Sequence, residues 1–234
     1  MATRTLLSWS SGKDSAWALH VLQAMRDIEV VGLFTTVNEA FGRVAMHGVR
    51  TALVEAQAAA AGLPLHLLPI PNPCPNDVYE RTMAAFVTTC RADGVQAMAF
   101  GDLFLEDIRA YREKNLAGTG IQPIFPLWGI DTAALARTMI AGGLEAYVTC
   151  VDPRKVPEHF AGRRFDARLL EDLPDGADPC AENGEFHTFA CAGPMFSRPI
   201  GVTRGETVTR DGFVFCDLTI PSPHTSSGMG GGLG

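Results

Sequence analysis

The chain has 234 residues, and its 26 acidic and 19 basic side chains give a formal net charge of −7 at pH 7. Hydrophobic residues make up 47% and charged residues 19%, proportions that allow a buried core and exclude a largely disordered chain. The acidic balance argues against broad binding to duplex nucleic acid or tRNA, because such binding needs cations that neutralise phosphates. The 24 Gly and 15 Pro follow no period, which excludes collagen-like and coiled-coil folds.

Signals for a membrane or export route are weak in this sequence. No stretch approaches about 18 consecutive apolar residues, so no membrane span is expected. The first ten residues turn polar too soon to hold the apolar core of a signal peptide. We therefore expect a cytoplasmic protein. Its six cysteines form no CxxC pair, and in a reducing compartment we expect them to be free thiols.

Short apolar runs alternate with helical patterns over the first two-thirds of the chain. The alanine-rich run 49–61 ends at Gly62, and glycine commonly follows the last residue of a helix. Asp77 and Glu80 have the spacing of a capping box, which predicts a helix start. The predicted strands are Thr5–Trp9, Glu29–Val37, Leu65–Ile70, Ala97–Gly101, Ile121–Pro126 and Ala146–Val151. The predicted helices are Ser15–Met25, Val49–Ala61, Asp77–Arg91, Asp107–Leu116 and Thr132–Ala141.

This alternation predicts an α/β fold with a parallel sheet covered by helices on both faces. The composition changes after residue 151, where Pro, Gly and acidic residues become frequent. Farther on, Thr207–Thr209 and Phe213–Leu218 flank Asp211-Gly212, and Asp-Gly is a strong hairpin signal. We expect an N-terminal domain over residues 1–130, a smaller C-terminal α+β domain over 131–220, and a disordered Ser/Gly/Pro-rich tail over 221–234.

A Ser/Gly turn joins the first predicted strand to the first helix, with the sequence Ser-Ser-Gly-Lys-Asp-Ser. A turn in this position points backbone N–H groups and the positive helix end at one spot, which suits a phosphate group. The spacing is neither a Walker A loop nor a GxGxxG turn. Asp14 either holds Mg²⁺ or caps the helix, and an ordinary capped turn is the alternative for the whole segment. The phosphate-binding candidates are Ser10, Ser11, Gly12, Lys13, Asp14 and Ser15.

A second polar segment reads Glu-Asn-Gly-Glu-Phe-His-Thr. Polar and aromatic residues alternate in it, which can turn one polar face toward a cleft. Two carboxylates and a histidine can coordinate Mg²⁺, orient ammonia or accept a proton from ammonium. A turn and edge strand held by local hydrogen bonds is the alternative. The catalytic candidates here are Glu182, Asn183, Glu185, His187 and Thr188.

Two further residues are candidates because of where they fall in the predicted sheet. Asp102 follows the strand that ends near Gly101, and open α/β sheets bind ligands at the carboxyl ends of their strands. His47 lies between the second strand and the next helix, where it can either reach a nucleotide or serve the fold.

The motifs together resemble a known family. The 10–15 turn is similar to the PP-loop of the N-type ATP pyrophosphatases, with Ser11 at a position where that superfamily usually has glycine. Within the superfamily, Gly101-Asp102, Pro126-Leu127-Trp128 and above all Glu182–Thr188 resemble the diphthine–ammonia ligase group. The resemblance covers roughly residues 5–220. Within this group, the sequence is more similar to a bacterial branch.

The resemblance implies a PP-loop fold of the adenine nucleotide alpha-hydrolase-like type that binds ATP and Mg²⁺. The adenine base would lie near Leu33–Thr36, with Thr35 among its contacts, and Asp14 would serve the metal. The implied reaction joins a carboxylic acid to ammonia through an acyl-adenylate, releasing AMP and pyrophosphate. The acid is diphthine on elongation factor 2 in eukaryotic and archaeal members. Bacteria lack diphthamide, so a bacterial member would use another acid.

Two other functions stay open at this point. A tRNA-modifying PP-loop enzyme is one, although the net charge and the lack of a CxxC pair argue against it. A non-catalytic protein that binds an adenine nucleotide is the other. The sequence contains no glutaminase-like region, so free ammonium is the implied nitrogen donor. A homodimer is also left open.

Overall fold

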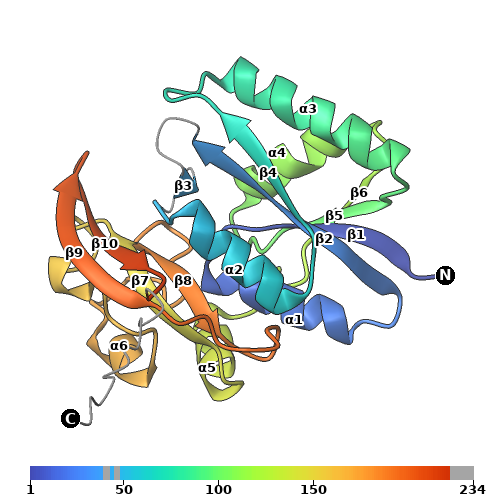
Figure 1. The fold of residues 1–234 in the computed structure, drawn as a ribbon. Helices are drawn as coiled ribbons and strands as arrows, with labels where there is room; N and C mark the ends of the chain where they lie inside the picture. The colour runs from blue at the N-terminus through green and yellow to red at the C-terminus, as the bar shows by residue number, and fades with distance from the viewer. Residues whose placement is uncertain (39–42, 45–47, 222–234) are drawn as a thin grey trace, which may run out of the picture.

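A parallel sheet with helices on both sides forms the N-terminal part of the protein, as seen in a computed structural model that describes residues 1–38, 43–44 and 48–221 (Figure 1). Five strands pair in parallel in the order β4-β2-β1-β5-β6, and β3 pairs antiparallel with the end of β2. The strands are β1 (Thr3–Ser8), β2 (Ile28–Asn38), β3 (Arg43–Val44), β4 (Leu65–Ile70), β5 (Ala97–Ala99) and β6 (Gln122–Ile124). The helices are α1 (Lys13–Ala24), α2 (Thr51–Ala61), α3 (Asn76–Ala92) and α4 (Glu106–Leu116).

Neighbouring residues of the central strand β1 pack against different helices, because successive side chains of a strand point to opposite faces. Leu6 lies in a buried cluster with Val87 of α3 and Leu116 of α4. Leu7 lies in the larger buried cluster, which includes Leu53 of α2. Helices therefore cover both faces of the sheet, and the predicted α/β fold is confirmed.

A smaller antiparallel sheet follows in the chain and packs beside α1 (Figure 1). Its strand order is β8-β7-β10-β9. The larger buried cluster joins the two parts, since it holds Trp9 and Leu19 together with Val148 and Phe189. The predicted boundary at residue 130 stays a prediction. The elements of this part are α5 (Thr132–Ala141), β7 (Glu145–Val151), the 3₁₀ helix η1 (Glu158–Phe160), α6 (Ala167–Asp172), β8 (Phe186–Ala192), β9 (Thr203–Arg210) and β10 (Phe213–Thr219).

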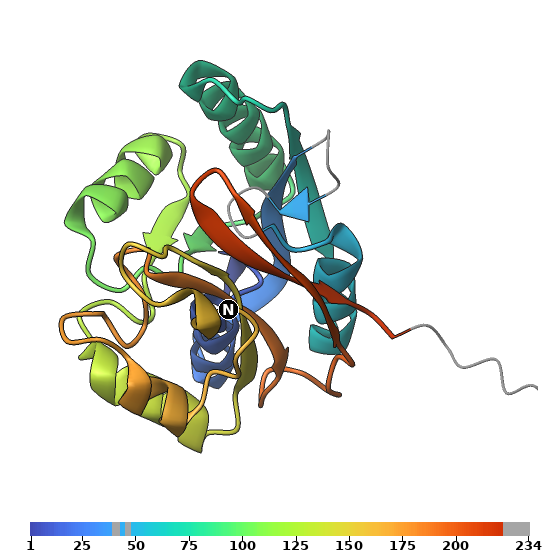
Figure 2. The same ribbon diagram turned by 90° about the vertical axis from the view of Figure 1, so that its left-hand side faces the viewer.

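The predicted Asp-Gly hairpin is confirmed and reaches from the small sheet toward β3 (Figure 2). Asp211 and Gly212 both have positive φ, at 53° and 80°, as a type I′ turn requires. Asp217 of β10 ties the hairpin to the first sheet through Arg43, at 3.1 Å, and Arg50, at 2.6 Å. Every residue of β9 is exposed, and β9 is an edge strand.

Several expectations about local structure were met and one was wrong. Gly62 ends α2 in the left-handed conformation with φ of 69°. The capping box was wrong: Pro75 occupies the N-cap of α3 with no side-chain cap, and Asp77 instead pairs with Arg81 at 2.8 Å. All six cysteines are free thiols. Within the described ranges, no helix has both the length and the apolarity to cross a bilayer. His47 and residues 222–234 of the expected tail lie outside the described residues.

Candidate functional site

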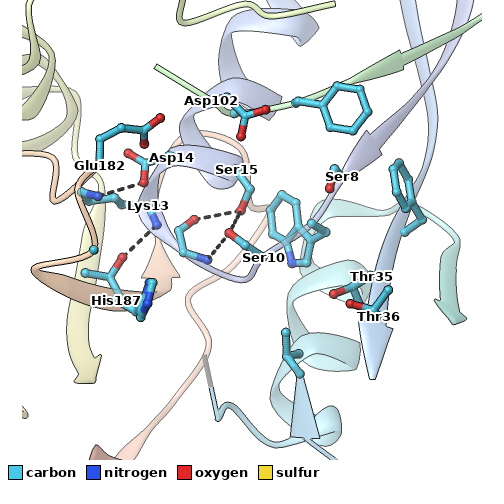
Figure 3. Close-up of a pocket in the computed structure, with 18 of the residues that line it drawn as sticks. Ser8, Ser10, Lys13, Asp14, Ser15, Thr35, Thr36, Asp102, Glu182 and His187 are labelled. Carbon is cyan, nitrogen blue, oxygen red and sulfur yellow. Dashed lines mark hydrogen bonds and ion pairs between the residues drawn. The ribbon is translucent and has the colours of Figure 1, made fainter. Parts of the chain in front are cut away.

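A cavity with a volume of about 610 Å³ opens at the carboxyl ends of β1, β2 and β5 (Figure 3). Ligands bind at this edge of open α/β sheets. The segment between α6 and β8 closes the opposite side. Residues of both motifs and of several other elements line the wall, among them Ser8, Ser10, Gly12, Lys13, Asp14, Ser15, Thr35, Thr36, Asp102, Arg112, Cys180, Glu182, His187 and Thr188.

Hydroxyl groups hold the turn that follows β1 in a closed shape. The Ser10 and Ser15 hydroxyl oxygens lie 3.1 Å apart, and Ser10 Oγ also accepts from the Gly12 N–H at 3.3 Å. Ser15 Oγ is 3.1 Å from the Gly12 carbonyl. Ser11 is fully buried with φ of 71°, a left-handed conformation that glycine adopts without strain. Glycine, which the PP-loop superfamily usually has at this position, would adopt this conformation without strain.

Gln57 of α2 stabilises the same turn by hydrogen bonds, and the sequence patterns did not identify this residue. Its side chain is fully buried and makes three hydrogen bonds. It accepts from Trp9 Nε1 at 2.8 Å, and its amide donates to the carbonyls of Ser11 at 2.9 Å and Ala190 at 2.7 Å. The available signal was a single amide inside the otherwise apolar run 56–61.

Lys13 lines the cavity, and protein groups hold its ammonium. Its Nζ donates to Asp14 Oδ2 at 2.8 Å and to the Cys180 carbonyl, and its expected contact with phosphate stays a prediction. The Phe165 and Phe186 rings lie 5.6 Å and 5.7 Å from Nζ. Burial lowers the pKa of Lys13, but Asp14, Cys180 and Glu182 together outweigh burial and hold the pKa above 10.5. The ammonium group therefore joins the turn to the 178–188 segment.

Three carboxyl groups gather at one end of the cavity (Figure 3). Burial raises the pKa of Asp14, with Lys13 opposing, and raises the pKa of Asp102, with Arg112 opposing. Burial also raises the pKa of Glu182 to about 7, and the Asp14 and Asp102 charges add to the rise. The Leu103 N–H, which donates to Glu182 Oε1 at 2.8 Å, opposes the rise. Among the described residues, Asp14 Oδ1 and Asp102 Oδ2 are buried oxygens without a hydrogen-bond partner.

The second motif divides between the cavity wall and the loop that supports it. Glu182, His187 and Thr188 line the cavity, and Asn183 and Glu185 do not. Glu185 is 3% exposed, and its Oε1 accepts from the Asp178 N–H at 3.0 Å and from Asn183 Nδ2 at 3.3 Å. The expected polar face is therefore incomplete, because β8 begins only at Phe186 and Glu185 belongs to the preceding bend.

His187 and Thr188 meet the cavity in different ways. Burial, followed by the nearby Lys13 charge, lowers the pKa of His187 to about 4, so the imidazole is neutral near pH 7. Thr188 Oγ1 accepts from the backbone N–H of Lys13 at 3.0 Å and so satisfies a free donor at the start of α1. A Cβ on Gly12 would lie 3.2 Å from the Thr188 carbonyl, so glycine permits this close approach.

Two family models cover most of the chain. A model of the diphthamide synthase N-terminal domain matches residues 3–123, and a model of the diphthamide synthase C-terminal domain matches residues 131–219. The chain belongs to the diphthamide synthase family. The expected resemblance is confirmed at the level of the family.

Curated relatives of the diphthamide synthase family agree at modest identity. A diphthine–ammonia ligase of Danio rerio is 31% identical over 132 residues, which cover 54% of this chain and 50% of the relative. Those of Bos taurus and Homo sapiens are 26% and 25% identical over 156 and 151 residues, which cover 64% and 62% of this chain and 58% and 56% of the relatives. The chain thus spans little more than half the length of these relatives.

The ends of β2 and β5 supply a further part of the cavity wall in this family member. Thr35 and Thr36 stand at the carboxyl end of β2, where the resemblance places the adenine base. Gly101 follows β5, and a Cβ there would lie 3.1 Å from the Asp14 carbonyl carbon and the Ser15 nitrogen. Glycine thus lets the end of β5 approach the first turn of α1 and brings Asp102 to the cavity.

Proposed function

We propose that the protein is an ATP-dependent ligase that joins a carboxylic acid to ammonia and releases AMP and pyrophosphate. One observation carries the proposal: the 10–15 turn and the 182–188 segment line the same cavity, although about 170 residues separate them. The names of the relatives support a ligase of the diphthine–ammonia type. Diphthine is one candidate acid.

ATP would lie with its phosphates at the start of α1 and its base near Thr35. A helix N-terminus attracts phosphate, and the Ser10 and Ser15 hydroxyls stand beside it. Lys13 would contribute at a distance, by holding the 178–188 segment against the turn. A carboxylate oxygen of the acid attacks the α-phosphorus, the bond to the bridging oxygen breaks, and pyrophosphate leaves with that electron pair.

Magnesium fits this site as an ion shared with the nucleotide. Among the described residues, no group of three or more His, Cys, Asp or Glu side chains is arranged to hold a metal. Asp14 Oδ1 offers one buried oxygen without a hydrogen-bond partner. Mg²⁺ usually takes one or two carboxylates together with phosphate oxygens and water, so this single ligand suffices. The ion would supply charge neutralisation of the triphosphate.

Glu182 is the proposed base of the second half-reaction. Its pKa of about 7 lets the carboxylate take a proton from ammonium near neutral pH, whereas His187, with a pKa of about 4, is a weaker base. The nitrogen of ammonia then attacks the acyl carbon, and the bond to the AMP oxygen breaks with its electron pair on AMP. The nitrogen releases one proton to solvent, and an amide and AMP result. The Asp102 carboxylate would stabilise the positive charge of the ammonium ion beside Glu182.

The reaction can be tested with ATP labelled at the α or γ phosphate, together with ammonium and candidate acids. We expect AMP and pyrophosphate in amounts that depend on both co-substrates, and about a 10²-fold loss of amide formation in Glu182→Gln. Release of ADP and orthophosphate would refute the proposal. Nucleotide binding without turnover would favour a non-catalytic role, and turnover only with tRNA would favour a tRNA-modifying enzyme.

A metal-dependent binding experiment separates the two roles of Asp14. Asp14→Asn should weaken ATP binding more in the presence of Mg²⁺ than in its absence, because the lost carboxylate serves the ion. An equal loss in both conditions would assign Asp14 to the turn alone.

We also propose a cytoplasmic homodimer, in which the exposed edge strand β9 pairs with β9 of a second copy.

A further inference from the structure

A second cavity of about 290 Å³ lies between α3 and α4 and adjoins the site. The two cavities share four wall residues: Tyr79 and Met83 of α3, Phe100 after β5, and Arg112 of α4. We call the second cavity the α3–α4 groove. A ligand in the groove would therefore meet a nucleotide in the larger cavity at these four side chains.

The groove is lined mainly by apolar residues, together with Glu80, Lys114 and Asn115. Tyr79, Met83 and Val87 recur every four residues along α3 and so share one helix face. Val87 is buried, whereas Tyr79 and Met83 are only half-buried, because they border the two cavities. Met98 and Phe100, 0% and 4% exposed, form the floor. Such a wall favours a hydrocarbon body over a polar one.

Arg112 stands at the junction as a positioned cation. Its guanidinium carbon lies 5.0 Å from the centre of the Phe100 ring, a cation–π contact that helps to hold the group in place. Asp102 Oδ2 approaches Nε only to 3.5 Å, and this buried Nε has no hydrogen-bond partner among the described residues. A guanidinium has five N–H donors, so the approach of Asp102 leaves donors for another carboxylate.

We propose that the α3–α4 groove binds the apolar body of the carboxylic acid substrate, and that Arg112 holds its carboxylate beside the nucleotide. The proposal rests on the proposed ligase function and adds the substrate class: an aliphatic or aromatic monocarboxylic acid. At about 30 Å³ for each group of one heavy atom, the groove accommodates an acid of about ten carbons. A bidentate contact from Arg112 orients the attacking oxygen.

Binding can be measured without turnover by calorimetry with straight-chain acids of increasing length, in the presence of a non-hydrolysable ATP analogue. We expect affinity to rise about fourfold with each added methylene until the groove is full near ten carbons. The primary alcohol of the same length should bind at least about tenfold more weakly, since it lacks the charge that Arg112 pairs with.

Two variants and a matched control locate the site. Ala84 lines the groove but not the larger cavity, so Ala84→Phe should shorten the longest acid that binds while nucleotide affinity stays the same. Arg112→Gln should remove the preference for acid over alcohol. Arg109→Gln is the control, because Arg109 lies one turn away on α4 and stacks on Phe125 and Trp128 instead. It should bind acids like the wild type.

The outcomes separate this proposal from the proposed function. Affinity that does not depend on chain length, or that Ala84→Phe leaves unchanged, would overturn the groove as the acid site. Equal effects of Arg112→Gln and Arg109→Gln would overturn the role of Arg112. Acids that bind in the expected pattern without AMP release would support the groove and refute the ligase. AMP release that requires a short polar acid would do the reverse.

Discussion

Glu182→Gln provides a test of the acidic end of the cavity that needs no substrate. Burial raises the pKa of Glu182 from 4.5 to about 7 in the folded protein. Between these pH values the folded state binds more protons than the unfolded state, so the free energy of unfolding falls as the pH rises. Glutamine keeps the oxygen that accepts from the Leu103 N–H and removes the titration.

The size of the effect follows from the same shift. A full shift from 4.5 to about 7 corresponds to about 3 kcal/mol at 1.36 kcal/mol for each pH unit. Glu182 borders an open cavity, and water there screens its charge, so we expect about 1–2 kcal/mol. The wild type should lose this much stability relative to Glu182→Gln between about pH 5 and about pH 8.

Urea unfolding of both proteins across this pH range measures the difference directly. Glu171→Gln is a suitable control, because it removes one exposed carboxylate from α6, outside the cavity wall. Its stability should run parallel to that of the wild type. Parallel curves for Glu182→Gln as well would refute the reasoning, because they would mean that Glu182 is as well solvated in the folded state as in the unfolded chain.

Three further predictions concern the turn and the free edge. Ser11→Gly should raise the free energy of unfolding by about 1 kcal/mol, as it relieves a left-handed conformation and removes a buried hydroxyl without a partner; chemical denaturation would show this, and a loss would contradict it. Gln57→Leu should cost about 3 kcal/mol or more in the same assay, because it leaves buried groups unpaired. Two β9 strands that pair antiparallel with Val208 opposite Val208 would also place Glu206 opposite Arg210. Val208→Lys would set two like charges opposite each other, so the mass measured by sedimentation should fall to that of a monomer. An unchanged mass would exclude this interface.

Periodic patterns predicted the regular elements well where the burial of one face decides the structure. The bounds of β4 and α5 agree with their predicted ranges. Those of β2 differ by one residue at each end, and those of α4 by one residue at its start. Patterns failed where tertiary contacts decide. The two-residue strand β3 forms only by pairing with β2, and α6 lies in a region rich in Pro and Gly without a clear period.

The sequence predicted which residues lie at the candidate site, but it did not predict where their side chains point. The two motifs point to the same cavity because the carboxyl ends of parallel strands share one edge, and the small sheet packs against that edge. The direction of Lys13 depends on a carbonyl 167 residues away, and that of Glu185 depends on where β8 begins. Neither dependence has a local sequence signal.

The shape of the phosphate-binding turn is therefore a property of both sheets. Thr188 Oγ1 accepts from the Lys13 N–H, and the Cys180 carbonyl accepts from the Lys13 ammonium. The Ala190 N–H donates to the Ser11 carbonyl at 2.9 Å. These contacts stabilise Ser11 in a conformation that is unfavourable for a residue with a Cβ. A change in the 178–190 segment should thus reach the nucleotide through the backbone of the turn. In the proposed ligase, the contacts of the 178–190 segment with the 10–15 turn would couple the ATP site to the site of the second substrate.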